Sequence, residues 1–320
     1  MNATAVQNQD EYEDLLSLWS DLESGLGIIL GSPDSTQEFE QRVRQYDHWM
    51  RALLERDTDL GLYLLFQLAT NSPVGYSASH ALVCAVLCHL IALDLGLPES
   101  EHDSLVRAAL TMNIAMTALQ DELAEQTEKP SATQQNGIRT HAVKGAMMLG
   151  NIGVTNALWL DTVALHHEES QEKTALKDLA PARRLAHILH VVDRYAAMIS
   201  PRKSREGRSA TDSARTIVTG ANNENDEVSR ALVRAVGLCP PGTFVRMEDR
   251  RVAVVMRRSS EPNLPLVAIV LSEAGALLKP PKLHRTANGN PAIKSALTAS
   301  AMHEHLNHYL ILRLGVNATA

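Results

Sequence analysis

The chain has 320 residues, of which 45% are apolar and only 4% aromatic, so its core must consist mainly of aliphatic side chains, which favours helices. A net charge of −7 and the lack of a basic tail argue against a nucleic-acid-binding surface. No run of about 18 uninterrupted apolar residues predicts a membrane span, and the N-terminal stretch lacks the pattern of a secretory signal.

The cysteines also restrict the class of protein. Their odd number and their spacing suit neither a disulfide framework nor a zinc knuckle. Cys84 and Cys88 are one helical turn apart in an apolar run, where cysteine packs as a small buried hydrophobe. We therefore expect no zinc site from this pair and predict a reduced, cytoplasmic protein.

Residues 1–73 are expected to form an N-terminal helical region of three helices that starts with an acidic one, and residues 74–238 a helical domain. The first helix of that domain is almost wholly apolar and should be buried. Residues 119–136 are polar and poorly periodic, which predicts a loop or a weak helix. The predicted helices cover about 11–30, 36–56, 56–69, 77–95, 101–118, 139–150, 155–170 and 182–199, and one more starts near 209.

The pattern changes after about residue 239, where β-branched residues alternate with Gly and Pro. This predicts three or four short antiparallel strands and then a final helix over 290–314. We therefore expect a third region, 239–320, of strands and a final helix. The fold class predicted for the whole chain is mainly α, with an N-terminal helical extension and a small C-terminal β-hairpin region.

Five scattered residues are candidates for metal binding. His166 and His167 are adjacent in the segment ALHHEES, and imidazole is a frequent metal ligand. His80 and His141 lie on predicted helices, and Asp193 lies on an apolar helix face, where an unpaired carboxylate is costly. Each alone is more often structural, but together they would suit iron, manganese or zinc. Their separations along the chain do not show that they converge.

The order of these residues resembles the HD-GYP domain, a subgroup of the HD metal-dependent phosphohydrolases, over about residues 74–256. The segments that carry the resemblance are YSASHALVCAVLCHLIALDLGL, THAVKGAMML, ALHHEES, ILHVVDRYAAMISPRKSR and PPGTFVRMEDRRVAVV. The resemblance implies an HD-domain helical bundle in a bacterial signalling protein. It also implies one metal site, whose ligands map to His80, His141, His166, His167 and Asp193.

The sequence departs from this family at the residues that carry its chemistry. The His-Asp signature falls on Met112 and Asn113, and the lysine that follows it falls on Met116. Methionine cannot replace imidazole at a hard or borderline ion, and a neutral amide cannot bridge two cations as a carboxylate does. The Gly-Tyr-Pro segment is absent after the double histidine, and an acidic ligand of some members is Tyr76 here. We therefore assign no catalytic residue.

The missing carboxylate bears on how many ions the site can hold. Two divalent ions about 4 Å apart repel each other by about 4 kcal/mol even at the dielectric of water. A binuclear site is therefore not expected. Two alternatives remain. The protein binds one divalent ion through His141, His166 and His167, with or without Asp193, or it binds no metal.

The resemblance also implies contacts to the phosphates of cyclic di-GMP, which map to Arg202 and Arg205. Guanidinium groups bind phosphate in a planar, bidentate manner, so the assignment is chemically sensible. The alternative is a solvated basic loop. Because the Gly-Tyr-Pro segment is missing, another nucleotide remains an alternative ligand.

Three functions therefore compete. We expect a catalytically degenerate HD-GYP-like signalling module that binds a nucleotide or a protein partner, because the residues that carry the chemistry are the ones missing. The first alternative is a metal-dependent cyclic di-GMP phosphodiesterase or other phosphohydrolase with an altered mononuclear site. The second is a purely structural interaction module. The acidic N-terminal helix is a candidate surface for a signalling partner or a homodimer.

Overall fold

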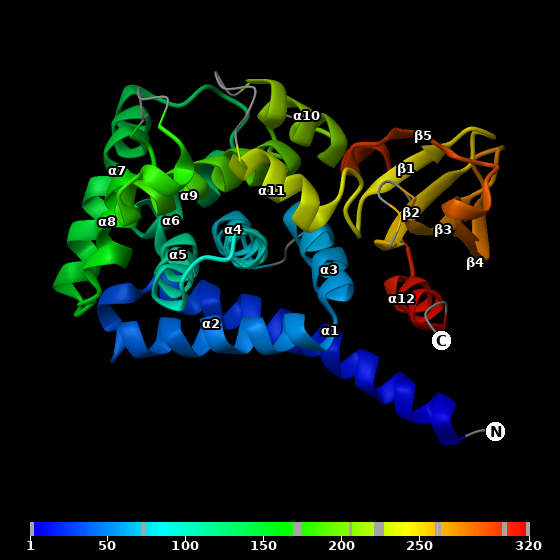
Figure 1. The fold of residues 1–320 in the computed structure, drawn as a ribbon, viewed down its shortest axis with the longest axis horizontal. Helices are drawn as coiled ribbons and strands as arrows, with labels where there is room; N and C mark the ends of the chain where they lie inside the picture. Colours follow the sequence, from blue (N-terminus) through cyan, green and yellow to red (C-terminus); the bar gives the residue numbers. More distant parts are fainter. Residues whose placement is uncertain are drawn as a thin grey trace.

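The computed structural model is mainly α-helical, with a small antiparallel sheet near the C-terminus, which confirms the predicted fold class (Figure 1). The residues that it describes are 3–71, 74–168, 174–204, 207–220, 227–259, 261, 264–302 and 306–317.

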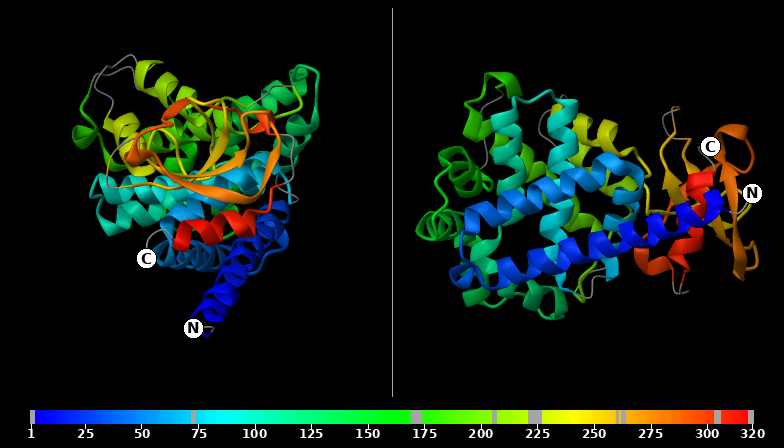
Figure 2. Two further views of the ribbon diagram at one scale, coloured as in Figure 1. Left: turned by 90° about the vertical axis from the view of Figure 1, so that its right-hand side faces the viewer. Right: turned by 90° about the horizontal axis from the view of Figure 1, so that it is seen from below.

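Three helices form the N-terminal part: α1 (Ala3–Gly31), α2 (Phe39–Arg56) and α3 (Thr58–Asn71). In α1, Trp19, Leu22 and Leu26 recur at helical spacing and are buried against the rest of the protein. The N-terminal end of α1 extends away from the body of the molecule (Figures 1 and 2). The three predicted N-terminal helices are thus confirmed.

Helix α4 (Tyr76–Asp94) is the centre of the helical body, in contact with α1, α3, α5 (Glu99–Thr111), α9 and α11. Within the described residues, α4 is the one helix that is long and apolar enough to cross a membrane. However, 83% of its apolar window is buried inside the fold. A core helix passes the same test of length and composition, and we assign α4 to the core.

The helices that follow surround α4. They are α6 (Thr117–Glu125), α7 (Ala132–Asn151), α8 (Ala157–Leu165), α9 (Pro181–Ile199), α10 (Ala210–Gly220) and α11 (Glu227–Val236). Of the two alternatives predicted over 119–136, the helix is confirmed for most of the range, because α6 and the start of α7 occupy it. Ser131 and Gln134 form a reciprocal capping box, which satisfies backbone N–H groups at the start of α7. Such a cap starts a helix even where apolar periodicity is poor.

The sheet is five-stranded and antiparallel, in the order β4-β3-β2-β1-β5. Its strands are β1 (Phe244–Met247), β2 (Val252–Arg257), β3 (Leu266–Leu271), β4 (Leu277–Arg285) and β5 (Ile293–Ala296). The number of strands therefore exceeds the three or four predicted. The single helix predicted over 290–314 is also wrong, because β5 pairs with β1 and the α-helix described there, α12 (His308–Asn317), begins only at His308. Figure 2 shows the sheet at one end of the helical body, with α12 beside it.

One hydrophobic core joins the three predicted regions. It includes Leu26 of α1, Leu87 of α4 and Phe244 of β1. The opposite face of the sheet holds a separate, smaller cluster around Val255 and Val267. The division at residues 73 and 238 stays a prediction, because a shared core does not say which parts fold alone.

Candidate metal centre

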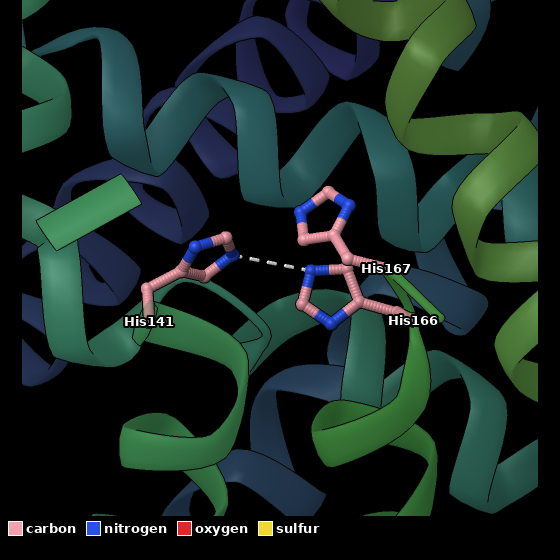
Figure 3. A group of neighbouring side chains, drawn as sticks. All are labelled: His141, His166 and His167. Atoms are coloured by element: carbon pink, nitrogen blue, oxygen red, sulfur yellow. Dashed lines mark hydrogen bonds between the residues drawn. The ribbon is translucent and has the colours of Figure 1, made fainter. Parts of the chain in front are cut away.

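Three histidines converge where α7 approaches the end of α8 (Figure 3). His141 lies in the middle of α7, whereas His166 and His167 directly follow the last residue of α8. The helix predicted over 155–170 is therefore too long, because α8 ends at Leu165 and the histidine pair lies after it. One ring nitrogen of each lies within 4.8 Å of those of the other two. His141 and His166 are buried, and His167 is exposed. The structure thus brings together three of the five residues that the sequence singled out.

The hydrogen bonds of this trio fix which nitrogens carry protons. His141 Nδ1 donates to the carbonyl of Ile138 at 2.6 Å, and His166 Nδ1 donates to the carbonyl of Val163 at 2.7 Å. A neutral imidazole has only one N–H, so both Nε2 atoms carry lone pairs. These two atoms nevertheless face each other at 3.2 Å (Figure 3).

Two lone pairs at this separation repel unless a positive charge lies between or beside them. A proton is disfavoured, because burial lowers the pKa of His166 to about 3 and also lowers the pKa of His141. A divalent cation fits better, since metal-bound histidines characteristically donate their second N–H to a carbonyl or carboxylate. The residues present therefore suit one ion held by nitrogen ligands.

A second group lies between α4 and α9. His80 Nε2 is 2.8 Å from Asp193 Oδ1 and 3.6 Å from Cys84 Sγ. Burial alone would raise the pKa of Asp193, but the hydrogen bond from His80 and nearby histidines hold it well below its usual value. His80 and Cys84 are one helical turn apart on α4, and the structure adds the carboxylate of Asp193 to this pair.

This second group is satisfied differently from the first. Nε2 of His80 donates to the carboxylate of Asp193, and among the described residues its Nδ1 is buried without a partner. His80 therefore lacks the backbone anchor that prepares His141 and His166 for a metal. The 2.8 Å hydrogen bond occupies the two atoms that would otherwise bind a second ion.

Asp193 connects the two groups. Its carboxylate is close enough to raise the pKa values of His141, His166 and His167, although burial lowers each of them more. All five predicted metal residues thus lie in one region of the structure. Their roles as ligands stay a prediction.

Met112 and Asn113 lie at the turn between α5 and the short helix η2 (Ile114–Met116). This turn packs against α7, the helix that carries His141, and the carbonyl of Met112 approaches Gly145. The turn that carries Asn113 thus lies next to the helix that carries His141. The three-histidine group, as far as the chain is described, contains no carboxylate member.

Arg202, a predicted nucleotide-binding residue, lies beside the second group. Its Nη2 donates to the hydroxyl of Tyr76 at 2.9 Å, and its guanidinium lies 4.7 Å from the centroid of the Tyr76 ring. Tyr76 in turn stacks on His80, with the ring centroids 5.5 Å apart and the planes at 14°. The other predicted nucleotide-binding residue, Arg205, lies outside the described residues.

His190 is a neighbour of the site that sequence reasoning missed. It lies on α9, one turn before Asp193, and its Nδ1 donates to the carbonyl of His166 at 3.0 Å. Its ring centroid is 6.0 Å from that of His167. The spacing of three residues between His190 and Asp193, which places both on one helix face, was the available signal.

Comparison with curated proteins gives one relevant relative, a protein of Pseudomonas aeruginosa named as a cyclic di-GMP phosphodiesterase. It is 33% identical to this chain over 219 residues, which cover 66% of this chain and 51% of the relative. The chain thus spans about half the length of this relative. No family model matches the chain. The similarity supports an HD-GYP-like protein.

Proposed function

We propose that this chain is an HD-GYP-like signalling module that holds one divalent ion and binds cyclic di-GMP or a related nucleotide without hydrolysing it. The observation that carries the proposal is the contrast between the two halves of the site. One half presents two bare Nε2 atoms 3.2 Å apart, and the other is closed by a 2.8 Å hydrogen bond. Both groups have the spacing of a metal site, and the bare nitrogens of the first make it the better match for a single cation.

The ligand set proposed for the ion is His141, His166 and His167, with Asp193 as a nearby anion. Three neutral imidazoles suit zinc or ferrous iron. A bound ion would supply positive charge and Lewis acidity to a phosphate oxygen. The protein holds the rings in place through the carbonyls of Ile138 and Val163.

The asparagine at position 113 supports the proposed lack of hydrolysis. In two-metal phosphohydrolases both ions take part in the displacement at phosphorus, and a shared anion holds them together. Asn113 cannot supply that charge, and Asp193 is engaged by His80. Binding needs less than catalysis, because an arginine and one cation are enough to recognise a phosphate diester.

Isothermal titration calorimetry with cyclic di-GMP tests the binding part. We expect saturable heat from the wild-type protein and a large loss of affinity in Arg202→Ala. Arg215→Ala is the matched control, because Arg215 is an exposed arginine whose ion pair is confined to α10. No heat from the wild-type protein, or equal losses in both variants, would refute nucleotide recognition by Arg202.

A mononuclear phosphodiesterase is the second candidate, and one observation favours it. A three-histidine set leaves one coordination position open, as catalytic zinc sites do. The two candidates differ in the formation of linear dinucleotide from cyclic di-GMP, which chromatography resolves. Metal-dependent product from the wild-type protein that disappears in the His166→Ala, His167→Ala double variant would establish the enzyme. Equal background rates in both proteins would support the binding module.

The acidic helix α1 stays our proposal for the contact with a signalling partner or with a second copy of the chain. It is supported by the way its N-terminal end projects from the body of the molecule (Figure 2).

A further inference from the structure

Three side chains form a stack at the second group of the site, which contains His80, Cys84 and Asp193. Arg202 lies over the ring of Tyr76, and the ring of Tyr76 lies over that of His80. His80 is 2% exposed and is itself held by Asp193. The stack therefore holds the guanidinium of Arg202 near His80 and Asp193. The residue between them, Tyr76, was noted in the sequence only as the replacement of an acidic metal ligand.

The hydroxyl of Tyr76 can still donate a hydrogen bond. A tyrosine hydroxyl carries its proton at neutral pH. Its oxygen accepts from Arg202 Nη2 at 2.9 Å. Among the described residues, no acceptor is found for its own O–H. A phenol that accepts one hydrogen bond can still donate another.

The guanidinium of Arg202 has unused donors as well. Its Nε is buried and has no partner within the described part of the chain. Its one hydrogen bond there is the one to Tyr76. A buried donor without an acceptor is costly, so an oxygen supplied from outside would be stabilising at this place.

We propose that Tyr76 is a positioning residue that holds Arg202 as a fixed cation, and that the two side chains form a two-donor corner for one non-bridging oxygen of a phosphate diester. This corner lies beside His80, which is hydrogen-bonded to Asp193. Arg202 there contributes the positive charge that a second ion would contribute in a binuclear site. The proposal rests on nucleotide binding as the function of this chain, and it adds the residue that directs the arginine.

A double-mutant cycle tests this assignment by calorimetry with cyclic di-GMP, on the full-length wild-type protein and on Tyr76→Phe, Arg202→Ala and the double variant. Tyr76→Phe keeps the ring stack and removes the hydroxyl. We expect it to weaken binding by about tenfold, the size of one hydrogen bond to a charged group. In the Arg202→Ala background the same change should weaken binding clearly less, because the hydroxyl then loses only its own hydrogen bond to the phosphate and no longer positions a guanidinium.

Tyr195→Phe is the matched control. Tyr195 is fully buried on α9, and its hydroxyl has no partner among the described residues. This variant should bind like the wild-type protein, and the metal content of Tyr76→Phe should equal that of the wild-type protein. Arg202→Lys, which keeps the charge without the planar fork, should also bind more weakly.

The outcomes separate the two proposals. Absence of binding by the wild-type protein refutes nucleotide binding itself. Wild-type binding with an unchanged affinity in Tyr76→Phe refutes the role of Tyr76 alone. Equal losses from Tyr76→Phe with and without Arg202 would show a general packing effect and would also refute it.

Discussion

His89 and His102 form a buried pair between α4 and α5, and this pair should make the protein lose stability in acid. Their rings are joined by a 2.8 Å hydrogen bond and are 7% and 8% exposed. Both pKa values are lowered to about 4, mainly by burial and also by the neighbouring Arg51. His102 adds to the lowering at His89, whereas Asp103 acts in the opposite direction on His102. Between about pH 4 and pH 6.5, both rings are therefore neutral in the folded protein, whereas the same histidines bind protons in the unfolded chain.

The sign and size follow from proton linkage. Between about pH 6.5 and pH 4 the unfolded state binds more protons, so the free energy of unfolding falls as the pH falls. Above about pH 6.5 the contribution is fully present. A depression from 6.5 to about 4 corresponds to about 3 kcal/mol for each ring, of which about 2 kcal/mol is lost by pH 5.

Urea unfolding of the wild-type protein and of His102→Gln measures this loss. Glutamine keeps a hydrogen-bonding group beside His89 but cannot be protonated. We expect the loss of unfolding free energy between about pH 7 and pH 5 to be about 2 kcal/mol smaller in the variant. His48→Gln, at an exposed position of α2, should follow the wild-type curve. Equal acid-induced losses in His102→Gln and the wild-type protein would refute the reasoning.

Three further changes test the site and its surroundings. The His166→Ala, His167→Ala double variant should lose nearly all bound metal after gel filtration, as measured by elemental analysis, because two of three imidazole ligands are gone. The Met112→His, Asn113→Asp double variant should gain metal and approach two ions per chain, because a bridging carboxylate is restored. Asp47→Asn should lower the free energy of unfolding in urea by about 1–3 kcal/mol, because Arg51 and Arg107 each lose one hydrogen-bonded anion and keep only Asp103.

Each of these predictions has a matched control. His284→Ala, on strand β4, should leave the metal content unchanged. Asp212→Asn, in an ion pair whose members are 62% and 70% exposed, should change the unfolding free energy by less than about 1 kcal/mol. Unchanged metal content in the Met112→His, Asn113→Asp variant would contradict the importance given to that pair. An Asp47→Asn effect as small as that of Asp212→Asn would contradict the value assigned to the buried pair.

Local patterns predicted most of the helices, because apolar periodicity records which face of a helix is buried. Local patterns gave wrong predictions where a helix or strand depends on a polar contact or on a contact with a distant part of the chain. Helix α7 starts at a capping box of Ser131 and Gln134, and β5 exists because Val245 of β1 pairs with Ala296. Neither contact leaves an alternating or helical trace in its own segment.

The candidate site was predictable in its residues but not in its bonding. His80 and Asp193 are 113 positions apart, and their approach was inferred only from the resemblance to a family. The sequence could not reveal that these two bond to each other, while His141 and His166 present bare nitrogens. The stack of Arg202 on Tyr76 was equally hidden, because it joins the start of α4 to the segment after α9.

A metal count in crystals of the purified protein, by anomalous scattering at the absorption edge of the bound element, tests the central claim most directly. The account predicts one ion per chain, bound by His141, His166 and His167, with His80 still hydrogen-bonded to Asp193. Two ions joined through a carboxylate, with the bond between His80 and Asp193 broken, would contradict it.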